Sequence, residues 1–95
     1  MKLLTAIVRD EYALDVSTKL NAADLQCTRI ASTGGFWRKG YVTMLIGVEE
    51  NEIDKALAII DDNAGPEIDP NLAPSSHPPH RATIFVLDVD QFARY

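Results

Sequence analysis

Two segments of this sequence, residues 41–48 and 81–89, are apolar at most positions along their length. Their length and β-branched content are typical of strands, in which successive side chains point to opposite faces of a sheet. Both faces of these strands are therefore apolar. Helices can cover only one of the two faces, so the other face needs a second subunit. The pattern predicts a sheet protein that forms an obligate oligomer.

The remaining segments complete a regular order of elements. Residues 2–9 form a short apolar run bounded by charge, and residues 27–33 are mostly uncharged and β-branched; both predict strands. Apolar residues recur at helical spacing in residues 12–23, with Ser17 expected on the exposed side, and a second helix follows an acidic stretch and ends near residue 63. The order predicts an α+β, ferredoxin-like βαββαβ fold: a four-stranded antiparallel sheet with two helices on one face.

A chain of 95 residues is long enough for one domain with one core, so we expect residues 1–95 to form a single domain. All five prolines lie in residues 64–80, which predicts a long mobile loop. No apolar run approaches the roughly 18 residues of a membrane helix, and the first residues lack the cleavage site of a signal peptide. The single cysteine cannot form an internal disulfide. We expect a cytoplasmic protein without membrane insertion.

The charge distribution indicates the kind of ligand. A net charge of -5 argues against a nucleic-acid-binding protein, which normally carries a basic face. Residues 25–48 contain no acidic residue but include Arg29, Arg38 and Lys39. Such a neutral-to-basic window attracts small anionic ligands. Chance clustering on so short a chain is an equal explanation.

No motif of known catalytic chemistry is present, so the sequence predicts a protein that is not an enzyme and needs no cofactor. His77 and His80 are separated by two prolines and lack a third ligand nearby, which favours exposed loop residues over a metal site. Cys27 falls inside a predicted strand and is expected to be a buried, inert thiol.

The segment TGGFWRKG, residues 33–40, is the best candidate for ligand binding. Glycines such as Gly35 allow a sharp bend and expose backbone N–H groups. Phe36 and Trp37 offer rings on which a purine can stack, and Arg38 with Lys39 supplies positive charge for phosphate. On the residues alone, a simple turn with a core-anchoring Phe36 explains the segment equally well.

These motifs resemble those of the PII-like cyclic-di-AMP receptor proteins of Gram-positive bacteria. The opening MKLLTAIV, the stretch CTRIASTGGFWRKG and the ending ATIFVLDVDQF are similar, in that order, to the family's first strand, its second strand with a glycine turn, and its last strand with the tail. The loop over residues 64–80 is shorter than the family's. The resemblance implies a homotrimeric signalling protein that binds one cyclic-di-AMP in each interface cleft and signals to a partner protein through mobile loops.

The resemblance also implies which residues contact the ligand. The identities kept at the family's contact positions are those of Thr28, Gly35, Phe36, Gly47 and Phe85. Other contact positions differ from the family's residue: Trp37 replaces a leucine, Gln26 an arginine, Tyr41 and Asp24 asparagines, and Arg94 a glutamine. These departures leave a second reading open, in which a relative that has lost cyclic-di-AMP senses another nucleotide, a small anion or a divalent metal ion.

Overall fold

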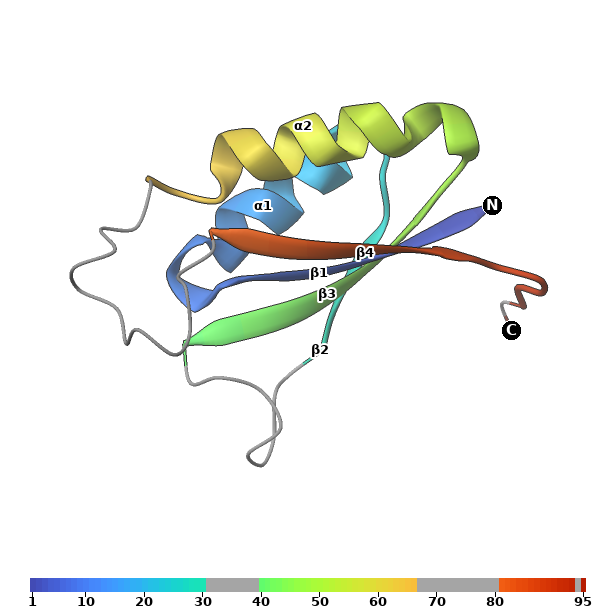
Figure 1. Cartoon of the computed structure of the whole chain (residues 1–95), viewed down its shortest axis with the longest axis horizontal. Coiled ribbons are helices and arrows are strands. Elements are labelled where there is room, and N and C mark those ends of the chain that lie inside the picture. The colour runs from blue at the N-terminus through green and yellow to red at the C-terminus, as the bar shows by residue number, and fades with distance from the viewer. Residues whose placement is uncertain (31–39, 67–80, 94) are drawn as a thin grey trace.

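The structure is a computed structural model that describes residues 1–30, 40–66, 81–93 and 95. Along the chain the elements are β1 (Lys2–Arg9), α1 (Asp10–Ala22), β2 (Cys27–Ile30), β3 (Tyr41–Val48), the 3₁₀ turn η1 (Glu50–Glu52), α2 (Ile53–Asn63) and β4 (Ala82–Asp88). The strands form one antiparallel sheet in the order β2-β3-β1-β4, and both helices cover the same face (Figure 1). The prediction of a ferredoxin-like α+β fold is confirmed.

The helix starts differ from the sequence-based expectation. Helix α1 begins at Asp10 rather than at Tyr12, because Asp10 and Glu11 occupy its first turn, where the helix dipole favours acidic side chains. The acidic stretch before α2 folds as the separate turn η1, and the Glu49 N–H donates to the Glu52 carboxylate at 2.9 Å. The predicted strand over residues 27–33 is described as far as Ile30, and its remainder lies outside the described residues.

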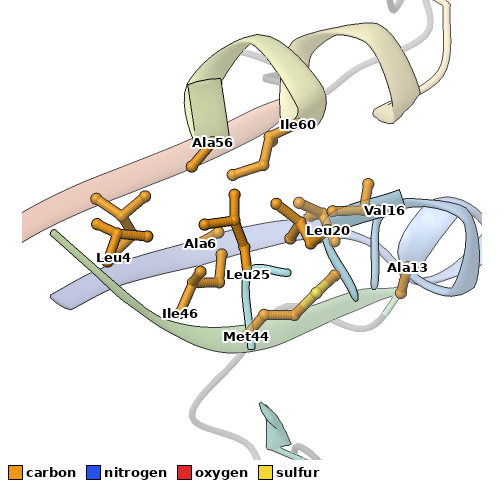
Figure 2. Close-up of a cluster of buried hydrophobic side chains, with 12 residues drawn as sticks. Leu4, Ala6, Ala13, Val16, Leu20, Leu25, Met44, Ile46, Ala56 and Ile60 are labelled. Carbon is orange, nitrogen blue, oxygen red and sulfur yellow. The ribbon is translucent and has the colours of Figure 1, made fainter. Parts of the chain in front are cut away.

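The hydrophobic core lies between the helices and the sheet. Leu4 of β1, Ile46 of β3, Leu20 of α1 and Ile60 of α2 are almost completely buried and point toward one another (Figure 2). Ser17 is also buried, so its expected exposure was wrong. Its hydroxyl donates to the Leu14 carbonyl at 3.0 Å, which satisfies the group within its own helix and lets it lie beside the core.

The opposite face of the sheet, which we call the open face, is covered by none of the helices that the structure describes (Figure 1). Because Leu4, Ala6 and Val8 point into the core, the alternate residues of β1 lie on the open face. The strand pairing places Phe85 and Leu87 of β4 on this face, with 53% and 49% of their surface exposed. The expectation that β4 is apolar on the uncovered side is confirmed, and this apolar surface is uncovered in the single chain.

Hydrogen bonds from side chains link both ends of α2 to other parts of the chain. Near its start, the Lys55 ammonium donates to the Ala23 carbonyl at 3.1 Å, just beyond α1. Beyond its end, Arg9 donates to the carbonyls of Ala64 at 2.6 Å and Pro66 at 2.7 Å, while Arg81 donates to Gly65 at 2.9 Å. These bonds satisfy carbonyls that a helix end leaves without partners. None of the helices in the described ranges is long and apolar enough to cross a bilayer.

Candidate functional site

A pocket of about 490 Å³ lies on the open face, at the end of the sheet where β1 begins and β3 ends. Four of the positions predicted to contact ligand line it together: Asp24, Gln26, Thr28 and Gly47. The full lining consists of Met1, Leu3, Asp24, Gln26, Thr28, Leu45, Gly47, Val89 and Phe92. The pocket therefore draws on the starts of β1 and β2, the end of β3 and the tail after β4.

Strand alternation explains why these residues share one surface. Leu45 and Gly47 are two apart on β3, so both lie on the open face. Thr28 pairs with Leu45, and Leu3 pairs with Gly47 across the antiparallel ladders. A β-carbon at Gly47 would lie 3.2 Å from the terminal methyl of Met1, which shows how closely the Met1 side chain covers this glycine. Gly47 and Met1 therefore line the pocket side by side, and the glycine adds no side chain of its own.

The N-terminus and the C-terminus lie at the same end of the sheet (Figure 1). The Val89 N–H donates to the Met1 carbonyl at 3.3 Å, which continues the β1–β4 pairing into the tail. Lys2 and Asp88 form an ion pair across the same two strands. This hydrogen-bonded contact raises the pKa of Lys2 and lowers the pKa of Asp88. These contacts bring the tail residues Val89 and Phe92 to the pocket wall.

The lining combines a polar side with apolar walls. Asp24 and Gln26 precede β2 and Thr28 lies within it, at alternate positions along the chain. The other lining residues are apolar or glycine. Such a surface can contact the flat face of an aromatic ligand while a few polar groups fix its orientation. The arrangement fits a small ligand with a base and polar edges.

Neither the metal nor the thiol alternative gains support from the described residues. Within residues 1–30, 40–66 and 81–93, no three His, Cys, Asp or Glu side chains are grouped so that they could hold a metal ion. His77 and His80 lie outside the described residues. Cys27 is half-buried beside Met44, with 3.3 Å between the sulfurs, and burial raises the pKa of its thiol. A raised thiol pKa makes this cysteine a poor nucleophile, as its strand position indicated.

Two further predicted residues that the structure describes, Tyr41 and Phe85, do not line this pocket. Tyr41 begins β3 at the opposite end of the strand, which places it about 20 Å from Gly47 at roughly 3.4 Å per residue. Phe85 lies on the open face, directly across the sheet from Thr28, but β3 and β1 lie between their two strands. Three strand spacings therefore separate Phe85 from Thr28, which is about 14 Å. The remaining candidates, Gly35, Phe36, Trp37, Arg38 and Arg94, lie outside the described residues.

Sequence reasoning missed five lining residues: Met1, Leu3, Leu45, Val89 and Phe92. Leu3 and Leu45 could have been found from strand alternation and pairing. Leu45 lies on the same face of β3 as the candidate Gly47, and Leu3 of β1 is the cross-strand partner of Gly47. Met1, Val89 and Phe92 flank strands and carry no local signal for binding. Their position follows from the antiparallel pairing of β1 with β4, which brings the start of β1 to the end of β4.

A sequence model of the cyclic-di-AMP receptor family matches residues 1–77. The chain belongs to this family. Members of the family are receptors, so the match agrees with a nucleotide-binding signalling role. The resemblance recognised in the motifs is thereby confirmed, and the pocket contains four of the positions at which that resemblance predicts ligand contact.

A crystal structure of similar fold comes from Pediococcus pentosaceus ATCC 25745, where the protein is described as functionally unknown. It is 33% identical in sequence, with a TM-score of 0.73. The match covers 99% of this receptor-family chain and 96% of the other chain, so the two share their architecture from end to end.

Proposed function

We propose that this member of the cyclic-di-AMP receptor family is a PII-like signalling protein that binds cyclic-di-AMP between the subunits of a homotrimer. Binding would be relayed to a partner protein through the segment over residues 64–80. The observation that carries the proposal is the pocket on the open face, which brings Gln26, Thr28 and Gly47 together in a chain of this family. A free, half-buried thiol at Cys27 is compatible with the cytoplasm as its location.

The trimer is supported by the apolar surface of the open face. Phe85 and Leu87 are half exposed on a strand that no helix covers on this side. Contiguous exposed apolar surface of this kind marks an interaction site in a soluble protein. A second copy of the chain would bury it, and the pocket on the same face would then lie at the subunit boundary.

The separation of the candidate residues supports a site shared by two subunits. Gly47 and Tyr41 stand at opposite ends of β3, about 20 Å apart, too far for one compact nucleotide to contact both within a chain. The segment over residues 33–40 joins β3 at the Tyr41 end. In the proposed site, one subunit supplies the pocket and its neighbour supplies the Tyr41 end, with Phe36, Trp37 and Arg38.

A mixing experiment tests this arrangement. A pocket variant (Gln26→Ala with Thr28→Ala) and a far-end variant (Trp37→Ala with Tyr41→Ala) should each lose cyclic-di-AMP binding by tenfold or more, at about 1–3 kcal/mol per lost contact. Co-expressed in equal amounts, the two variants should restore wild-type affinity at about a quarter of the sites, because each intact site needs an intact pocket and an intact neighbour.

Calorimetry gives both the affinity and the number of sites in this experiment, and light scattering confirms that each sample is a trimer of three 10.5 kDa chains. A site formed within one chain would show no restoration, because every chain would carry a defect. Failure of the wild type to bind any cyclic-di-AMP would overturn the function itself.

Replacing Gly47 by alanine should change the stability of the protein little but weaken its binding of cyclic-di-AMP. In Gly47→Ala, the added carbon meets only the flexible end of Met1, so the free energy of unfolding should change by less than about 1 kcal/mol. The methyl group would separate the ligand from the strand backbone, and we expect about tenfold weaker cyclic-di-AMP binding. Thermal unfolding and calorimetry measure the two effects separately. Unchanged affinity would remove Gly47 from the site.

A second candidate function is supported by two departures within the pocket. Asp24 and Gln26 line it where the resemblance places an asparagine and an arginine. A relative retuned to another nucleotide or small anion would show this kind of change. A thermal-shift panel of cyclic-di-AMP, ATP, ADP, AMP and divalent cations separates the readings, because a ligand at 100 times its dissociation constant stabilises the protein by about 2.7 kcal/mol.

A further inference from the structure

Asp24 carries the only ionisable side chain among the described residues that line the pocket. It is exposed and lines the pocket together with the polar side chains of Gln26 and Thr28. A carboxylate here places a negative charge at the edge of a site proposed for an anionic nucleotide. It accepts hydrogen bonds and donates none. Its chemistry therefore limits which part of a ligand can lie beside it.

The backbone at Asp24 is held in a fixed and unusual conformation. Asp24 has a φ of 62° and follows the end of α1. The backbone N–H of Asp24 donates to the Asn21 carbonyl at 3.1 Å, and the backbone N–H of Leu25 donates to the Leu20 carbonyl at 2.9 Å. This pair of bonds forms a Schellman motif, in which the left-handed position is usually glycine. Leu25, the following residue, is buried and fixes the corner against the core.

A second helix holds the same corner. The Lys55 ammonium of α2 donates to the carbonyl of Ala23, directly before Asp24. The direction in which the Asp24 side chain leaves the backbone is therefore determined by the fold before any ligand binds. Glycine adopts this left-handed conformation most easily. The chain nevertheless carries an aspartate here, at the cost of a less favourable backbone. This combination points to a role for the carboxylate in the pocket.

We propose that Asp24 is a specificity-determining residue that accepts a hydrogen bond from the 6-amino group of an adenine base. A phosphate beside the carboxylate would be repelled, so the base and not the phosphate lies at this end of the pocket. A 6-oxo purine would place its oxygen, an acceptor, opposite the carboxylate, so this pair of atoms forms no hydrogen bond, and the base would have to shift to offer its N1–H instead. The inference rests on the proposed function, because it assigns the base contact of that same nucleotide site.

The test compares cyclic-di-AMP with cyclic-di-IMP, which has the same two phosphates but a 6-oxo group in place of the amine. Because the ligand charge is identical, the ratio of dissociation constants reports the base edge alone. The wild type should prefer cyclic-di-AMP by about tenfold or more. In Asp24→Gly the ratio should fall to about threefold or less through weaker cyclic-di-AMP binding, while the melting temperature stays equal or rises.

Asp24→Asn provides the second variant, since an amide can accept from the amine or donate to the oxo group. Its ratio should also fall, but through tighter cyclic-di-IMP binding. If the wild type binds cyclic-di-AMP and both variants keep the wild-type ratio, this inference is overturned and the proposed function stands. If the wild type binds neither cyclic dinucleotide, the proposed function fails and the inference fails with it.

Discussion

Replacing Gly65 by alanine is expected to lower the free energy of unfolding by about 2–5 kcal/mol, as the sum of a backbone and a packing effect. Gly65 has a φ of 90°, which side-chain-bearing residues rarely adopt. A β-carbon there would also lie 2.6 Å from an Arg9 guanidinium nitrogen and press against the Tyr12 ring. Arg9 cannot withdraw freely, because it donates to Ala64 and Pro66 and stacks 4.7 Å from the centre of the Tyr12 ring.

Gly40 offers a matched control for this change. Its φ of 93° is almost the same, but none of the described residues lies within 4 Å of the position that a β-carbon would occupy. Gly40→Ala should therefore show only the backbone effect, about 1–2 kcal/mol. Urea denaturation of both variants at one protein concentration gives the comparison, since assembly makes stability depend on concentration. Equal losses at the two glycines would show that Arg9 and Tyr12 do not hold the end of α2.

Gly65 lies between the end of α2 and the proline-rich part of the chain. Residues 65 and 66 precede the segment 67–80 and residue 81 follows it, and the hydrogen bond from Arg81 to Gly65 joins the two sides at 2.9 Å. Arg81 further contacts Asp61 of α2 with an ion pair of 2.8 Å. Gly65→Ala would thus disturb the anchoring of both sides of that segment as well as the global stability.

Replacing Phe85 by aspartate should convert the proposed trimer into monomers at micromolar concentration. Phe85 is half exposed on the open face of the single chain, and in a trimer we expect the same ring to be buried against a neighbour. Aspartate would remove this apolar contact and bury an unpaired carboxylate instead, at several kcal/mol in each of three equivalent interfaces. Multi-angle light scattering measures the mass directly, with the wild type expected at three times 10.5 kDa.

Leu14→Asp is the control for a general effect of an added charge. Leu14 is a similarly exposed apolar residue, with 66% of its surface accessible, but it lies on α1, on the helical side of the sheet. This variant should remain a trimer with unchanged cyclic-di-AMP binding. A monomeric wild type, or a Phe85→Asp protein that stays trimeric, would contradict the proposed use of the open face. Loss of binding together with loss of the trimer in Phe85→Asp would support a site at the subunit boundary.

Much of the fold could be predicted because it depends on local patterns. The alternation in Tyr41–Val48 specifies both a strand and its two apolar faces, and the structure has this strand with the same limits. Errors arose where short-range signals compete. Ser17 is polar but small enough to be buried with its hydroxyl bonded inside α1, and the acids before α2 form a separate turn instead of the helix start.

The sequence by itself determined the order of elements, the apolar open face and the chemical types available for binding. It could not determine which candidates lie together, because that depends on strand order and register between segments far apart in the chain. Gln26, Thr28 and Gly47 meet because β2 pairs with β3, and Met1 meets Val89 because β1 pairs with β4. Tyr41 lies at the far end of β3 from Gly47, as the length of that one strand already requires. Only the tertiary structure shows which residues of different strands meet, because the contacts between strands are non-local and the periodicity of each strand is local.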